Sequence, residues 1–393
     1  MPQDEFTASF PEPVRVIHVI HSGATGGGPR VLMDCVEMAA SRGVENIVVC
    51  GSDGPLAADL QSRHVQTYLL SRTGKLSFAV SVPRLTRIFR SHSPSAVLLY
   101  GQFAGFYGAI ASRLAGVPAV YEAHFPSFFT DAGPVSRLRN FVAEWVSCRL
   151  TRETTVVSES ARAEYVRRGL QTATRLHLVA NGVRTPTAEP NVIQSLRQRL
   201  LGDATHLVLA AGRMEDQKGF DTLLKAMPEI AEQHPGARLA LVGDGARRAS
   251  LEILASELGL SDVVTFHASQ KTLDPWILAS DTVVVPSRYE PGGLIAREAM
   301  AAGRVVVATD VQGLSEAIDS GRTGILVPPD DPQRLADAVI QILSGADMRD
   351  RMSSSARETA TERFSREAMW LGYEAVIARL TGRALGTDGN RLR

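Results

Sequence analysis

Cysteine is scarce in this chain. Cys35, Cys50 and Cys148 are the only three in 393 residues, and their spacing fits neither paired metal ligands nor a disulfide framework. We therefore expect buried, small apolar side chains in a protein kept in a reducing compartment.

An excess of charge of one sign is also missing. The 42 Lys and Arg residues balance 42 Asp and Glu residues, which argues against a nucleic-acid-binding protein. The charges are unevenly spread, because residues 1–185 hold 19 basic and 14 acidic side chains. This excess suits an anionic partner or a membrane surface, or it is a fluctuation of surface composition.

Long apolar runs are absent as well. The acidic start Met1–Glu5 is followed by no apolar segment, which predicts no signal peptide. No charge occurs from Ser93 to Ser112, but this stretch contains Gln102 and three glycines, whereas a membrane span needs about 20 mainly apolar residues. We expect a cytoplasmic protein, with peripheral contact at the inner face of the membrane left open.

Short apolar runs rich in β-branched residues alternate with helix-like segments along the chain. Continuous runs of this kind are typical of parallel sheets covered on both faces, so the pattern predicts doubly wound α/β domains. The proline-rich stretch 181–190 separates two series of strands. The expected strands are 14–20, 47–50, 96–100, 119–121 and 155–157, then 207–210, 237–242, 263–266, 282–285 and 305–307.

The break predicts an N-terminal domain of residues 1–185 and a C-terminal domain of residues 186–364. A helix and tail at 365–393 are expected to pack back towards the first domain. Two such domains imply a ligand cleft between them, at the carboxyl ends of the strands.

The segment Pro286–Met300 carries the strongest chemical signal. It follows an expected strand and opens a helix near Leu294, where glycines allow close backbone approach and a helix N-terminus favours phosphate. Its carboxylates, Glu290 and Glu298, are eight positions apart and could accept hydrogen bonds from hydroxyls of one ligand. Alone, such a pair would indicate only two solvated side chains.

A second loop, Ala211–Gly219, also follows a strand. Its cations Arg213 and Lys218 suit a diphosphate, particularly because the sequence has no Asp-x-Asp metal motif. The plain alternative is a solvated basic loop.

Together these segments resemble the retaining glycosyltransferases of family 4, which have the GT-B fold of two Rossmann-like doubly wound domains facing each other across a cleft. The family's Glu-x7-Glu motif matches Glu290 to Glu298, and its Gly-Arg-x4-Lys-Gly motif matches Gly212 to Gly219. Further similar stretches are Ala299–Gly303, Val305–Thr309, Asn181–Val183, Val242–Gly245 and Gly324–Val327.

The resemblance implies a role for each matching residue of the C-terminal domain. Arg213 and Lys218 would bind the donor diphosphate and stabilise the departing nucleotide, while Glu290 would hold the sugar and Glu298 the ribose. The other implied donor-binding positions are Gly212, Gly243, Gly245, His267, Gly292, Gly293 and Leu294.

In the N-terminal domain, which the resemblance makes the acceptor-binding one, Gly27 and Gly28 would lie near the phosphates or the acceptor. His124 matches the family's active-site histidine beside the sugar. Read from the residues alone, a histidine just past the strand 119–121 could bind a hydroxyl or a phosphate oxygen, or be satisfied within its loop. Its neighbour Glu122 would be on the acceptor side at best.

The implied enzyme is a metal-independent hexosyltransferase that needs no cofactor beyond its nucleotide-diphosphate sugar. A UDP-sugar is favoured as donor, with GDP-mannose as the second choice. The acceptor would be a hydroxyl of a glycan, a glycolipid or a natural product, and the oligomeric state is left open. The alternatives are a sugar-nucleotide epimerase of similar architecture and a non-catalytic nucleotide-sugar-binding protein.

The sequence departs from the family pattern at three places. Arg184 and Arg304 replace a common aspartate and a common proline, and Gly26–Arg30 replaces a more usual pair of glycines followed by a small and an acidic residue. A separate feature is a run of arginines interleaved with apolar residues, which suggests either core packing, the commoner explanation, or a membrane-facing amphipathic helix. Its members are Arg137, Arg139, Arg149 and Arg152, with Leu138, Phe141, Val142, Trp145 and Val146.

Overall fold

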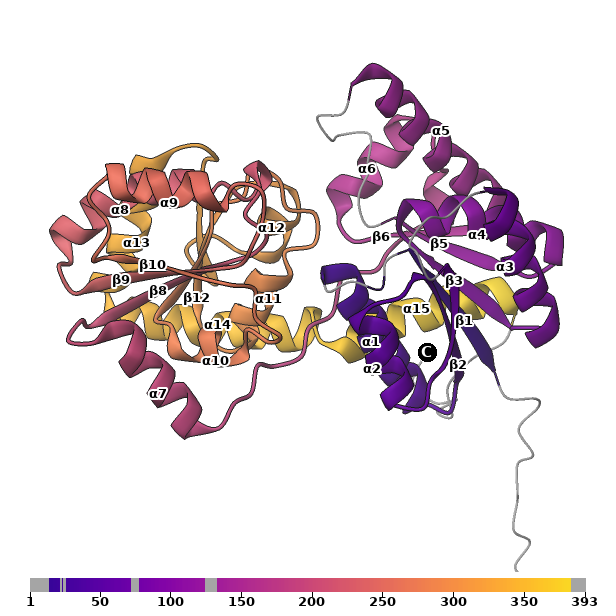
Figure 1. The fold of residues 1–393 in the computed structure, drawn as a ribbon, viewed down its shortest axis with the longest axis horizontal. Helices are drawn as coiled ribbons and strands as arrows, with labels where there is room; N and C mark the ends of the chain where they lie inside the picture. Colours follow the sequence, from indigo (N-terminus) through magenta and orange to yellow (C-terminus); the bar gives the residue numbers. More distant parts are fainter. Residues whose placement is uncertain (1–13, 22, 24–25, 72–77, 124–132, 383–393) are drawn as a thin grey trace, which may run out of the picture. The chain divides into compact units, whose positions relative to one another are not determined.

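The computed structural model describes residues 14–21, 23, 26–71, 78–123 and 133–382. The chain divides into two compact units, and each contains one parallel sheet covered by helices (Figure 1). Unit 1 comprises Met1–Val156, Arg162–Val179 and Met369–Arg393, and unit 2 comprises Val157–Ala161 and Ala180–Ala368.

The sheet of unit 1 has seven strands in the order β3-β2-β1-β4-β5-β6-β7. Its centre is apolar, since Ile17 of β1 lies beside Ile47 of β2 on one side and Val97 of β4 on the other, all with no exposed surface. The strands are β1 (Arg15–Ile20), β2 (Glu45–Ser52), β3 (Gln66–Ser71), β4 (Ala96–Tyr100), β5 (Ala119–Ala123), β6 (Glu153–Val156) and β7 (Leu176–Leu178).

Helices from both ends of the chain cover this sheet. The C-terminal helix α15 (Arg366–Thr381) buries Trp370 and Tyr373 completely or nearly so, and residues from Met369 onwards belong to unit 1. The other helices of this part of the chain are α1 (Gly27–Ala40), α2 (Pro55–Ser62), α3 (Phe78–His92), α4 (Gly101–Ala115), α5 (Pro134–Leu150) and α6 (Glu159–Arg167).

The sheet of unit 2 has six strands in the order β10-β9-β8-β11-β12-β13. The strand order reverses between β8 (His206–Ala211) and β11 (Thr282–Val285), and ligands of such sheets bind beyond the carboxyl ends of the strands at this point. The other strands are β9 (Ala237–Val242), β10 (Val264–His267), β12 (Val305–Thr309) and β13 (Gly324–Val327).

Helices lie on both faces of this second sheet (Figure 1). Two separate apolar clusters fill the space between sheet and helices, as a doubly wound fold requires. The helices are α7 (Pro190–Leu201), α8 (Phe220–Gln233), α9 (Arg248–Glu257), α10 (Asp274–Ala279), α11 (Leu294–Ala301), α12 (Gln312–Ala317), α13 (Pro332–Ser344) and α14 (Ala346–Arg363).

The sequence-based fold prediction is confirmed in its main elements. All ten expected strands are present, α11 begins at Leu294, and the linker ends where α7 begins at Pro190. The edge strands β3, β7 and β13 were not expected, because β3 and β7 are half-exposed and lack a continuous apolar run, and β13 has only a short run after a glycine. The three cysteines are buried thiols, as expected.

The structure also tests the interpretations of two apolar stretches, the uncharged run before Arg113 and helix α5. The uncharged run Ser93–Ser112 is divided between β4 and α4, and no helix within the described ranges is both long and apolar enough to cross a membrane. The core-packing interpretation of α5 is wrong for Leu138, Val142 and Trp145, which are exposed.

Candidate active site

Lys218 and Glu290 meet beyond the carboxyl ends of β8 and β11. The ammonium group of Lys218 donates a hydrogen bond to Oε2 of Glu290 and forms an ion pair with it. The hydroxyl of Ser287 donates to the same oxygen at 3.3 Å. Both charged side chains are largely shielded from solvent, with 16% and 11% of their surfaces exposed.

Hydrogen bonds to backbone carbonyls join the loop after β8 to the loop after β11. The side chain of Gln217 donates to the carbonyl of Tyr289 at 2.9 Å, and the amide of Arg288 donates to the carbonyl of Gln217 at 2.8 Å. Gly219 has a φ of 62°, and a Cβ there would lie 2.0 Å from the carbonyl oxygen of Pro286. Only glycine therefore allows this approach of the loops.

Arg288, beside Lys218 and Glu290, forms ion pairs that link the loop after β11 to its neighbours. Its guanidinium group binds both carboxylate oxygens of Asp221 at 2.9 and 2.8 Å and reaches Asp330 at 2.7 Å. The bidentate pair raises the pKa of Arg288 and accompanies a lowered pKa of Asp221. With Lys225, whose ammonium nitrogen lies 3.8 Å from Asp221, the cluster holds two charges of each sign, so Lys218 and Glu290 remain as the charged pair between the loops.

The loop after β9 lies directly against the loop after β8. The amide of Met214 donates to the carbonyl of Asp244 at 2.9 Å, and a Cβ at Gly243 would lie 1.9 Å from the carbonyl oxygen of Gly212. The carboxylate of Asp244 in turn accepts a hydrogen bond from the amide of Ser269 at 2.7 Å. The loops after β8, β9 and β10 are thus joined in one continuous edge.

His267 is the last residue of β10 on this edge. Its ring lies 4.8 Å from the ring of Trp276, and Nε2 is 2.9 Å from the hydroxyl of Thr265. Partial burial lowers the pKa of His267, so the ring is neutral near pH 7 and can offer a flat, uncharged surface to a ligand.

The N-terminus of α11 completes the group of loops in unit 2. Gly293 precedes the helix with a φ of 55°, and Leu294 is the first helical residue. A Cβ at Gly292 would lie 2.7 Å from the side-chain nitrogen of Asn181, which is too close for a side chain there. The first amides of a helix lack intrahelical acceptors and favour an anion. Glu298, one turn further along, is 4% exposed.

Arg213 differs from Lys218 in having an exposed side chain. Within the described residues it forms no ion pair or side-chain hydrogen bond. Its charge is therefore available to a ligand at the carboxyl ends of these strands.

One buried group was missed by sequence reasoning. Arg297 lies between the two motif glutamates in the chain, is 2% exposed, and donates a hydrogen bond to the carbonyl of Asn181 at 2.8 Å. Its guanidinium group also lies 4.4 Å from the centre of the Phe364 ring, and burial lowers its pKa to about 10. A cation on the apolar side of an amphipathic helix was the available signal.

The residues expected in unit 1 are placed less fully. Gly27 and Gly28 form the first turn of α1, while His124 lies outside the described residues. The suggestion that Glu122 is on the acceptor side is not supported, because it is 1% exposed and lies beside Tyr373 in the core of unit 1.

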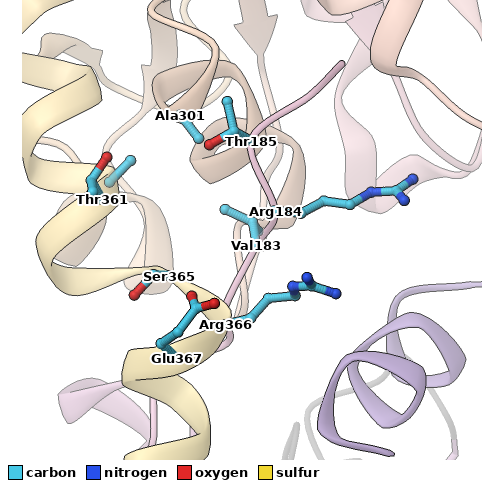
Figure 2. A pocket seen from close by; sticks show the side chains of 9 residues that line it. Val183, Arg184, Thr185, Ala301, Thr361, Ser365, Arg366 and Glu367 are labelled. Carbon is cyan, nitrogen blue, oxygen red and sulfur yellow. The ribbon is translucent and has the colours of Figure 1, made fainter. Parts of the chain in front are cut away.

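A separate cavity of about 230 Å³ lies in unit 2 where the linker runs past the start of α15 (Figure 2). Val183 pairs there with Ser365, and Arg184 lies 3.7 Å from Asp274. In Figure 2 the side chains of Arg184 and Arg366 extend to the same side. None of the expected donor-binding residues lines this cavity.

Comparison with known proteins identifies the family. Residues 25–186 match the model "Glycosyltransferase Family 4", and residues 193–359 match "Glycosyl transferases group 1". The chain is 31% identical to the alpha-D-kanosaminyltransferase of Streptomyces kanamyceticus over 276 aligned residues. These residues cover 67% of this chain and 71% of that protein. The chain is a family 4 glycosyltransferase. It uses a nucleotide-sugar donor, and its membership of a glycosyltransferase family decides against the epimerase and the non-catalytic binding protein.

Longer matches cover nearly all of this glycosyltransferase. It is 28% identical to the D-inositol 3-phosphate glycosyltransferase of Thermomonospora curvata, over 91% of this chain and 90% of that protein. The crystal structure of HepE from Anabaena in complex with UDP and glucose superimposes with a TM-score of 0.83 at 24% identity, over 93% of this chain and all of that one. The likeness confirms the GT-B fold.

Proposed function

We propose that this glycosyltransferase moves a hexose from a UDP-sugar to a hydroxyl of a glycan, glycolipid or natural-product acceptor, with retention of anomeric configuration. The observation that carries the proposal is the ion pair between Lys218 and Glu290, set among glycine-rich loops at the strand-order reversal. The choice of UDP is supported by HepE, whose structures contain UDP, UDP with glucose, or UDP-glucose. GDP-mannose is the second candidate donor.

The proposed roles follow from the position of each group. Arg213 and Lys218 bind the diphosphate, since one is unpaired in unit 2 and the other can exchange its carboxylate partner for a phosphate. Glu290 holds sugar hydroxyls and the buried Glu298 holds the ribose. The amides at the start of α11 donate hydrogen bonds to the phosphates, and the edge formed by Gly243, Gly245 and His267 holds the base.

The chemical step needs no separate protein base. The bond between the anomeric carbon and the β-phosphate oxygen breaks, and the acceptor oxygen bonds to that carbon on the same face. The acceptor's proton passes to the departing phosphate oxygen. Positive charges directed at the phosphates stabilise the negative charge that grows on the leaving group.

We further propose a division of labour between the halves of the chain. Residues 1–185 bind the acceptor and also place Gly27 and Gly28 near the donor phosphates and His124 beside the sugar, while residues 186–364 bind the donor. Residues 365–393 supply α15 and the tail. The basic excess of residues 1–185 supports an anionic acceptor or acceptor environment.

The first test is proton and phosphorus NMR of the full chain with UDP-, GDP- and ADP-sugars, in the absence of acceptor. We expect slow release of UDP from one UDP-sugar, because a retaining site transfers sugar to water at a low rate. Lys218→Ala and Glu290→Ala should each abolish this release.

Two variants serve as matched controls. Lys225→Ala removes a lysine and Glu232→Ala a glutamate from the exposed side of α8, and both should release UDP at the unchanged rate. Release from GDP-mannose alone would correct the donor, and conversion to an epimeric sugar would contradict transfer chemistry. Failure of every donor to bind would overturn the proposal.

A further inference from the structure

Helix α5 carries an apolar stripe on its solvent-exposed side. Val135, Leu138, Val142 and Trp145 are 83%, 64%, 47% and 45% exposed. They recur at intervals of three, four and three residues, so they share one face of the helix. Single exposed apolar residues are ordinary, but four aligned on one helix form a contiguous patch that requires an explanation.

Positive charge accompanies the stripe. Arg149 continues its spacing by four residues and places its guanidinium carbon 5.6 Å from the centre of the Trp145 ring. Arg137 and Arg139 are exposed near the start of the same helix. None of these three arginines pairs with a carboxylate in the part of the chain that the structure describes.

The exposed surface of α5 carries no acidic side chain. The only acidic residue of the helix, Glu144, has no exposed surface and accepts hydrogen bonds from the hydroxyls of Tyr121 and Tyr165 at 2.6 and 2.8 Å. The exposed charge of this helix is therefore entirely positive.

The opposite side of α5 is firmly packed. Ser147 and Cys148 are buried, and a Cβ at Gly105 of α4 would lie 3.0 Å from the Ser147 hydroxyl. The close contact with α4 fixes how the helix is rotated, so the stripe faces outward because the inner face is already occupied.

We propose that α5 is a membrane-docking surface for an anionic lipid bilayer, independent of which donor or acceptor the enzyme uses. The apolar side chains enter the interface between headgroups and acyl chains, and the arginines contact lipid phosphates. The aromatic ring of Trp145 beside a cation is suited to this polar and apolar boundary.

Charge and area favour a bilayer over a second copy of the chain. A symmetric dimer through α5 would set the two arginine groups against each other, and like charges across an interface are costly. Four partly exposed side chains offer on the order of a few hundred Å², whereas a stable dimer buries about 800 Å² per partner.

The test uses the intact chain with vesicles of phosphatidylcholine containing phosphatidylglycerol, and vesicles of phosphatidylcholine alone. At low salt we expect co-sedimentation with the anionic vesicles only. Phospholipids brominated near the headgroup end of the acyl chain should quench tryptophan fluorescence. Trp145 would be the quenched residue, because Trp276 and Trp370 are 6% and 0% exposed.

Paired variants separate the apolar from the electrostatic contribution. Leu138→Ser with Val142→Ser should abolish co-sedimentation, while Val192→Ser with Ile253→Ser, at exposed positions of α7 and α9, should leave it unchanged. Arg139→Gln with Arg149→Gln should weaken binding about 25-fold, or roughly fivefold for each arginine near an anionic surface. Arg334→Gln with Arg351→Gln is the control with the same net charge.

Several results would overturn the proposal. These are absence of vesicle binding by the natural chain, equal loss of binding in the control variants, or binding without quenching. A dimer in sedimentation equilibrium that Leu138→Ser with Val142→Ser dissociates would assign the stripe to a second copy instead. Circular dichroism confirms that each variant is folded before its binding is compared.

Discussion

Lys218 and Glu290 neutralise each other at the centre of the candidate donor site. In the proposed function, a donor diphosphate that binds Lys218 competes with a carboxylate that already pairs with the ammonium group. The same competition would free Glu290 for the sugar hydroxyls. The pair thus keeps two shielded charges compensated until the donor arrives.

We expect the ion pair to be measurable in a double-mutant cycle. Lys218→Met and Glu290→Gln should each lower the free energy of unfolding, because each leaves one shielded charge without its partner, and the double variant should lose less than their sum. The coupling should be on the order of 1–3 kcal/mol. Urea unfolding of the four proteins measures it, and additive losses would contradict the pair.

Gly219 should be intolerant of a side chain. Gly219→Ala combines strain at a φ of 62° with a Cβ 2.0 Å from the Pro286 oxygen, so the loops after β8 and β11 must separate. Gly202→Ala also has a positive φ, 55°, but nothing within 4 Å, and it should cost only the backbone strain, on the order of 1–3 kcal/mol.

Titration calorimetry with UDP and thermal unfolding would compare the two variants. We expect Gly219→Ala to lose UDP affinity and Gly202→Ala to keep it. Equal affinities would show that the contact between these loops does not support the donor site.

Arg297 should act on the donor site through the linker. Arg297→Met removes the hydrogen bond to the carbonyl of Asn181, whose side chain lies against Gly292 in the donor loop. We expect the donor KM to rise about tenfold, as loss of one charge-assisted hydrogen bond would cause, with a smaller change in kcat. Arg297→Lys retains a hydrogen-bond donor, so its donor KM should lie between those of the natural enzyme and Arg297→Met. An unchanged KM in steady-state kinetics would assign Arg297 a purely structural role.

The buried His18 should make unit 1 sensitive to acid. Burial lowers its pKa to about 4, and its ring nitrogens lie 2.9 Å from the Tyr100 hydroxyl and the Asn46 side-chain oxygen. The unfolded chain binds a proton near pH 6.5 and the folded one only near pH 4, so stability is full above pH 6.5 and decreases as the pH falls towards 4.

The loss attributable to His18 should be roughly 2–3 kcal/mol between pH 7 and pH 4.5. In His18→Gln this difference should shrink, whereas the exposed control His64→Asn should show the full difference in urea unfolding at both pH values. A slope unchanged by His18→Gln would contradict the assignment.

The sequence predicted structure best where a residue pattern is typical of a single kind of element. Continuous β-branched runs predicted the central strands, and a Pro-Gly-Gly turn after a strand predicted the start of α11 at Leu294. Edge strands such as β3 escaped notice because half-exposed strands share their composition with loops.

Side-chain pairing was not accessible in the same way. The sequence indicated Lys218 and Glu290 as separate ligand groups, but their mutual ion pair depends on two loops 72 positions apart. Arg297 was passed over because its contacts, a backbone carbonyl and the face of the Phe364 ring, carry no sequence signature. The exposure of Leu138 and Trp145 likewise depends on which face α4 covers.

The split composition of unit 1 has a consequence for synthesis. Its core includes Trp370, Tyr373 and Ile377, which follow all of unit 2 in the chain. The earlier segments of unit 1, up to Val179, are therefore synthesised before the helix that closes their core, and unit 2 is complete before unit 1. We expect unit 2 to finish folding first, the reverse of the usual order in which the N-terminal domain folds first. Until α15 emerges, the apolar surface it covers is exposed to chaperones and proteases.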